Sequence, residues 1–129
     1  MDFPSAEWLE ELQERCNEDE QFNRAAEWSD VNVVIGVDEE RYWLKLYGGE
    51  IIDTMTYEPM SNPLGYDVVV SGSKEAWEPV VAGDDTFWKA YSSGGILIDG
   101  DLLEANRMHE ALVRMAELMA ETQQAEVTV

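Results

Sequence analysis

Cysteine and histidine, which build many metal sites and nucleophilic active sites, are almost missing from this sequence. The chain of 129 residues has one cysteine, Cys16, and one histidine, His109. A lone cysteine cannot form a disulfide within the chain, and zinc sites need several nitrogen and sulfur ligands. We therefore expect no metal site and no cofactor. The single cysteine also indicates a reducing, cytoplasmic setting.

Basic residues are scarce too. Lysine and arginine together number 8 against 28 aspartates and glutamates, which gives a formal net charge of −20. Such a surface repels phosphate backbones, so we expect no nucleic acid partner. No apolar run approaches the ~20 residues of a membrane-spanning helix, and residues 1–7 lack the basic and apolar regions of a secretory signal. We expect an acidic, cytoplasmic protein with no integral membrane association.

Motifs of common enzyme classes are absent as well. The sequence contains no Gly-x-Ser-x-Gly turn, no phosphate-binding loop and no dinucleotide-binding glycine pattern. His109 is therefore expected to be a partly exposed helix residue, and Cys16 a buried, inert thiol. Two carboxylates acting as acid and base stay open, because 28 acidic residues give no basis for choosing a pair. We assign no catalytic residue and favour a non-catalytic role.

The first half of the chain predicts two helices followed by three strands. Ser5 can cap the first helix, whose apolar residues recur at helical spacing up to Cys16. The hydrophobic period then changes from helical to two, which is typical of strands. Two glycines at 48–49 mark a hairpin turn. The expected helices span 5–16 and 18 or 19 to 27, and the expected antiparallel strands span 31–37, 41–47 and 50–57.

The second half of the chain alternates short elements and ends on a long helix. Prolines and a glycine in 58–65 predict a loop. Ser73 can cap the helix after the fourth strand, and Asp84 or Asp85 can cap the next short helix. Asp101, with Glu104 three residues later, can cap the long helix. The remaining expected elements are strands over 66–71 and 96–98, helices over 73–81 and from Asp84 or Asp85 to 91, and the long helix from 101 to 121 or 122. We expect one α+β domain over residues 1–129.

The order of these elements resembles the sterol carrier protein type 2 family. Three local patterns agree with it: Gly-Gly-Glu at 48–50, a strand at 67–71 that leads into a helix start at 73–77, and Gly-Gly-Ile-Leu-Ile-Asp-Gly-Asp at 94–101 after Ala90. The resemblance implies a five-stranded, mostly antiparallel sheet covered on one face by helices. It also implies an apolar tunnel for sterols, fatty acids or fatty acyl chains, gated partly by the C-terminal region.

Aromatic residues and methionines are plentiful, and they suggest where an apolar ligand would lie. On the long helix, Ala105, Met108, Leu112, Met115 and Met119 recur at steps of three or four, which makes one apolar stripe. Such a stripe is ordinarily core, but flexible methionines can also form the wall of a pocket. We predict a pocket between the sheet and its helices, lined by six residues: Trp77, Phe87, Trp88, Met108, Leu112 and Met115.

Three functional hypotheses follow. The leading one is a carrier that binds a lipid or another apolar small molecule, such as a fatty acid, fatty acyl group or sterol, in an internal cavity. The second is an enzyme acting on a hydrophobic small molecule, such as a terpenoid, steroid or acyl ester, in the same cavity. The third is an acidic protein-interaction module, in which the short edge strand would serve a partner or a homodimer.

The excess of acidic residues generates a prediction about salt. If the acidity reflects adaptation to high salt, raising potassium chloride from 0.1 to 2 M should raise the melting temperature by roughly 5 °C, because a Debye length of ~3 Å screens the self-repulsion. Thermal unfolding followed by circular dichroism measures the shift. A melting temperature that stays flat or falls would contradict the idea.

Overall fold

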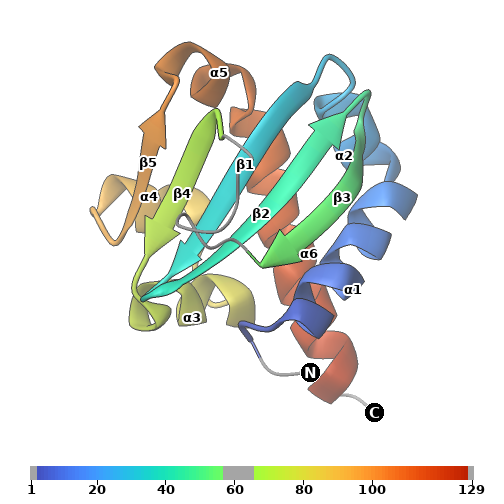
Figure 1. Cartoon of the computed structure of the whole chain (residues 1–129). Coiled ribbons are helices and arrows are strands. Elements are labelled where there is room, and N and C mark those ends of the chain that lie inside the picture. Colours follow the sequence, from blue (N-terminus) through green and yellow to red (C-terminus); the bar gives the residue numbers. More distant parts are fainter. Residues whose placement is uncertain (1–2, 57–65, 128–129) are drawn as a thin grey trace.

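A mixed five-stranded sheet forms one layer of the molecule (Figure 1). The computed structural model describes residues 3–56 and 66–127. Its strand order is β3-β2-β1-β4-β5, with β1 and β4 parallel and every other neighbouring pair antiparallel. This confirms the prediction of a mostly antiparallel sheet. The strands are β1 (Asp30–Val37), β2 (Glu40–Tyr47), β3 (Glu50–Thr56), β4 (Val68–Gly72) and β5 (Ile96–Gly100).

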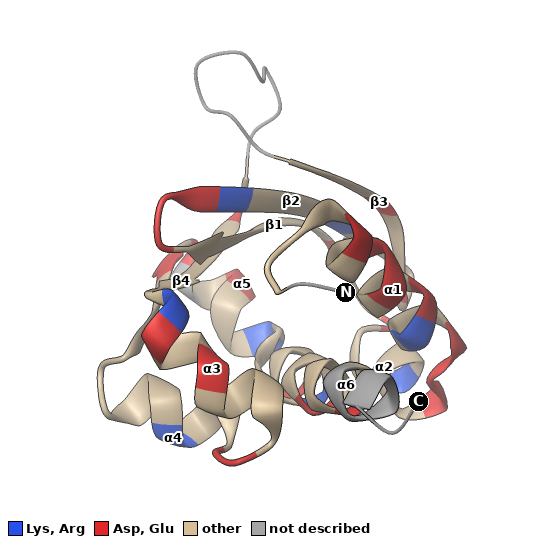
Figure 2. Cartoon of the chain, turned by 90° about the horizontal axis from the view of Figure 1, so that it is seen from below, with Lys and Arg blue, Asp and Glu red and all other residues tan. Residues whose placement is uncertain are grey.

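The helices lie on one side of this sheet, as expected (Figure 2). The long helix α6 lies in the middle, and α1, α2, α3 and α4 all contact it. Thus the core forms between the covered face of the sheet and α6. The helices are α1 (Ala6–Glu18), α2 (Glu20–Ala25), α3 (Lys74–Ala82), α4 (Phe87–Ser92), α5 (Leu102–Arg107) and α6 (His109–Val127).

The hairpin between β2 and β3 forms at the two glycines identified in the sequence. Gly48 and Gly49 have φ angles of 59° and 94°, a combination that side chains disfavour and that suits the twist of a two-residue hairpin. A Cβ on Gly49 would stand 2.5 Å from the carbonyl oxygen of Asn23. The side-chain amide of Asn23 donates to the Gly49 carbonyl at 2.8 Å, so this turn is fixed against α2.

Three of the predicted helix caps are confirmed, and one is wrong. Ser5, Ser73 and Asp101 each accept a hydrogen bond from a backbone N–H in the first turn of the following helix. The cap of α4 is Thr86, whose hydroxyl accepts from the Lys89 amide at 3.1 Å, rather than Asp84 or Asp85. The reason is that the backbone amides of both aspartates donate to the Pro79 carbonyl and so terminate α3.

The predicted long helix is divided into α5 and α6 by a break at Met108. Its apolar stripe is confirmed, since all five residues are buried. The helix continues past the expected end, to Val127.

The second helix is shorter than predicted, because Asp19 caps it and Ala26 ends it. Residue 57 and the expected loop over 58–65 lie outside the described residues, and the fourth strand begins at Val68 rather than at residue 66.

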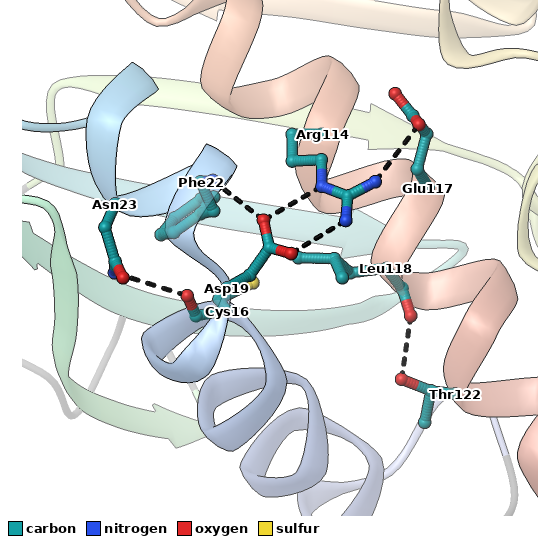
Figure 3. A network of polar contacts seen from close by, with 8 residues as sticks. All are labelled: Cys16, Asp19, Phe22, Asn23, Arg114, Glu117, Leu118 and Thr122. Atoms are coloured by element: carbon teal, nitrogen blue, oxygen red, sulfur yellow. Dashed lines mark hydrogen bonds and ion pairs between the residues drawn. The ribbon is translucent and has the colours of Figure 1, made fainter.

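One partly buried ion pair joins the N-terminal helices to α6 (Figure 3). The Asp19 carboxylate accepts from Arg114 Nε at 2.9 Å and from Nη2 at 2.7 Å. It also accepts from the backbone amide of Phe22 at 2.8 Å and thereby caps α2. The hydrogen bonds from Arg114 hold the pKa of the Asp19 carboxyl below its usual value. This side chain thus links three helices in one polar contact.

Replacing Asp19 separates its two roles. Asp19→Asn removes the charge but keeps an oxygen for the cap, and should lower the free energy of unfolding at pH 7 by about 1–2 kcal/mol. Asp19→Ala also removes the cap and should cost about 1 kcal/mol more. Because the folded pKa is lowered, the stability from the ion pair is present above about pH 4 and is lost as the pH falls through the folded pKa.

Urea unfolding between pH 2.5 and 7 checks these expectations. The difference between the native chain and Asp19→Asn should shrink below about pH 4. Glu20→Gln is the matched control, because Glu20 and its partner Arg24 are largely exposed and should contribute little. An equal loss in Glu20→Gln and Asp19→Asn, or a difference that persists in acid, would contradict the role given to the Asp19–Arg114 pair.

Candidate functional site

A small apolar void lies between the covered face of the sheet and helices α3, α4 and α6. Four of the six predicted pocket residues line it: Trp77, Phe87, Leu112 and Met115. Met108 is fully buried in the same core cluster but does not contribute to the lining. The structure therefore places four of the six predicted residues around one void, from two short helices and the stripe on α6.

Trp88 differs from the prediction. Its side chain is 54% exposed, and it does not line the void. Phe87, the residue before Trp88, is the first of the six residues of α4, and its side chain faces the core. The next side chain along a helix lies about 100° further round, which directs Trp88 outward. There its ring lies edge-on to that of His109, with centroids 5.2 Å apart.

Sequence reasoning missed four further lining residues. Ile35 and Val70 come from the paired central strands β1 and β4, and form the floor of the void. Ala116 and Met119 complete the wall on α6. Met119 belonged to the predicted stripe, so spacing alone could have found it. The two strand residues could not be assigned, because alternation gives the face of a strand but not its neighbour in the sheet.

The void contains no free polar group among the described residues. Its described lining consists of aliphatic, aromatic and thioether side chains. The one nitrogen there, Nε1 of Trp77, donates to the carbonyl oxygen of Gly36 at 2.9 Å in a buried hydrogen bond. An oxygen or nitrogen placed in the void would lose its hydration without gaining a partner. The void can therefore accept hydrocarbon and disfavours polar groups.

The size of the void is the main correction to the predicted hollow. Its volume is about 10 Å³, close to the least that holds a single water molecule. Pockets for small molecules usually measure about 300–1,000 Å³. No tunnel is open at these residues in this conformation, because their side chains fill the space beneath α4. A ligand would enter here only by displacing them.

The described residues form at least two open grooves along α6. The first, which we call the acidic groove, lies between the α3–α4 turn and α6, has a volume of about 380 Å³, and is lined by four carboxylates. It shares Phe87 and Ala116 with the void. The second, the mixed-charge groove, lies between α2 and α6 and measures about 400 Å³. It carries arginines, His109 and glutamates, and has no residue in common with the void.

Cys16 and His109 have the environments that the sequence suggested. The Cys16 thiol is buried, and burial raises its pKa, which disfavours the reactive thiolate. His109 is half-buried beside Trp88. Among residues 3–56 and 66–127, no three histidine, cysteine or acidic side chains are grouped so that they could hold a metal ion. In that same part of the chain, no helix has the length and apolar character needed to cross a membrane.

Comparison with known proteins gives a result for the fold only. No family model matches the sequence, and no curated protein is significantly similar to it. Among solved structures, the chain is similar to a crystal structure of sterol carrier protein 2, with a TM-score of 0.80, 16% identity, and 93% of this chain and 98% of that one covered.

Two further structures agree. A conserved hypothetical protein from Thermus thermophilus, described as possibly a sterol carrier protein, gives a TM-score of 0.76 at 18% identity, over 94% of this chain and 90% of the other. The sterol carrier protein domain 2 of Helicoverpa armigera gives 0.62 at 16% identity, over 89% and 87%. The resemblance noted in the sequence is confirmed at the level of structure: the chain has the sterol carrier protein 2 fold.

Proposed function

We propose that this chain is a carrier that binds a lipid or another apolar small molecule and buries its hydrocarbon part beneath α4. The observation that carries the proposal is the wholly apolar lining of the void between the sheet, α3, α4 and α6. The shared fold supports it, since several similar structures are sterol carrier proteins. On this proposal, residues 1–129 act as one carrier domain, and the ligand is a fatty acid, fatty acyl group, sterol or similar molecule.

Binding requires the void to enlarge, and the side chains around it allow this. Met115 and Met119 have flexible thioether chains that can adopt other rotamers. Phe87 is the one buried residue of α4. Exposing it would cost about 2–3 kcal/mol, whereas each buried CH₂ of a ligand contributes about 0.8 kcal/mol. Burial of about four CH₂ groups would therefore offset the loss of Phe87, before the cost of ordering the ligand.

Catalysis in the void has less support. Its described lining offers no carboxyl, hydroxyl or imidazole group. General acid–base or nucleophilic chemistry requires such a group within hydrogen-bond reach of the substrate. No observation on the described residues favours an enzyme over a carrier at this position.

A brominated hydrocarbon tests the proposal, because bromine quenches tryptophan fluorescence on contact. We expect 12-bromododecanol, kept below its solubility limit, to quench the tryptophan emission saturably, with a dissociation constant in the micromolar range. Trp77→Phe should remove most of the quenching, since Trp77 lines the void. Native mass spectrometry of the same samples should show one bound alcohol per chain.

Trp88→Phe is the matched control. It removes a neighbouring but exposed tryptophan, so saturable quenching should persist. Circular dichroism confirms that both variants are folded. The proposal fails if the native chain shows no saturable quenching and no bound alcohol. It also fails if Trp77→Phe is quenched as strongly as Trp88→Phe, because the chain would then bind elsewhere.

A further inference from the structure

The acidic groove is the outer side of the same site. Phe87 and Ala116 are the two described residues that line both the groove and the void. The groove has about 380 Å³ of space, enough for a polar head group and the first carbons of a chain. A hydrocarbon that displaces the Phe87 ring would therefore extend from the groove into the void, with its head left outside.

Phe87 of α4 lies where a hydrocarbon chain would pass from the acidic groove into the void. Of the six residues of α4, Phe87 alone is buried, while Trp88 and Tyr91 are exposed. Gly83, which ends α3, and Gly94, just after α4, have φ angles of 85° and 87°. Among the described residues, α4 buries one large apolar side chain, whereas α6 buries Leu112, Met115 and Met119 of the stripe. Phe87 is therefore the side chain of α4 that separates the acidic groove from the void.

The charged residues that line the acidic groove are all acidic. Its lining includes Asp84 and Asp85 from the α3–α4 turn, and Glu117 and Glu121 from α6, but no lysine, arginine or histidine. The turn is the red segment between α3 and α4 in Figure 2. Asp85 pairs with Lys89 at 3.1 Å, and Glu117 pairs with Arg114 at 3.3 Å.

The other two carboxylates, Asp84 and Glu121, are exposed and form no ion pair with any residue that the structure describes. Glu121 does interact electrostatically with Arg114, whose pKa is raised mainly by its hydrogen bonds to Asp19 and also by Glu121. The mixed-charge groove provides the contrast, because it contains Arg24, Arg114 and His109 as well as glutamates, and does not adjoin the void. Of the two grooves along α6, the one that borders the void is therefore the one that favours a positive charge.

We propose that the carrier site selects amphiphiles with a cationic head group: the hydrocarbon chain enters the void past Phe87, and the head group lies in the acidic groove beside Asp84 and Glu121. This inference rests on the proposed function and narrows its ligand class. A carboxylate head would lie beside the like charges of Asp84 and Glu121, on a chain of net charge −20. A fatty acid anion is thus the least favoured amphiphile of a given chain length.

Competition among ligands of equal length tests this selection. Dodecyltrimethylammonium, dodecanol and dodecanoate, each below its critical micelle concentration, are used to displace 12-bromododecanol and restore the tryptophan emission. At 20 mM sodium chloride we expect the cation to bind about tenfold more tightly than the alcohol, and the carboxylate more weakly than the alcohol. At 0.5 M sodium chloride the preference should fall to about threefold or less, because salt screens charges in an open groove.

A pair of double variants separates the groove from the overall charge. Asp84→Asn with Glu121→Gln should reduce the preference for the cation to about threefold at low salt and leave dodecanol binding unchanged. Glu10→Gln with Glu14→Gln is the matched control, because it removes two exposed charges from α1, on the other side of α6 (Figure 2). Tetramethylammonium, which has no chain, should displace nothing.

The outcomes are distinct. Equal affinities for the three head groups, or an equal loss of preference in both double variants, would overturn the selection and leave the carrier proposal standing. Displacement by tetramethylammonium alone would also overturn it, since the chain would then play no part. If dodecanol itself does not bind, the carrier proposal fails and the head-group preference fails with it.

Discussion

Helix α6 packs its apolar face against the central strands, and this contact positions the other helices. The stripe from Met108 to Met119 is buried, and α1, α2, α3 and α4 each lie against the same helix. The Asp19–Arg114 pair adds a directional contact, which fixes the junction of α1 and α2 on the flank of α6 (Figure 3). Both the void and the acidic groove are bounded by α6, so its placement determines the geometry of the proposed site.

Local signals in the sequence predicted most of the elements and their faces. Ser5, Ser73 and Asp101 are caps whose side chains act within one turn, so the sequence alone identifies them. Thr86 was missed because three possible caps stand in a row, and tertiary hydrogen bonds decide among them. The break at Met108 could not be predicted, because no proline or glycine lies near it in the sequence. The parallel pairing of β1 with β4 is non-local, and a period of two cannot reveal it.

The candidate site was only partly accessible to sequence reasoning, for a physical reason. Spacing shows that Leu112 and Met115 face the core, but it does not show whether the core is filled or hollow. Packing density depends on how side chains from different elements interlock, here those of Trp77 and Phe87 against Ile35 and Val70. The acidic groove depends in the same way on tertiary structure, because its carboxylates come from two segments about thirty residues apart.

The burial of Cys16 has a practical consequence. It is the chain's sole cysteine, it lies in the core, and its raised pKa keeps it protonated at neutral pH. A cysteine introduced on the surface would therefore be the one reactive thiol in the folded protein. Site-directed spin or fluorophore labels could be attached at α4 or α6 without first replacing the native cysteine, and distances across the α3–α4 turn could be followed as ligand is added.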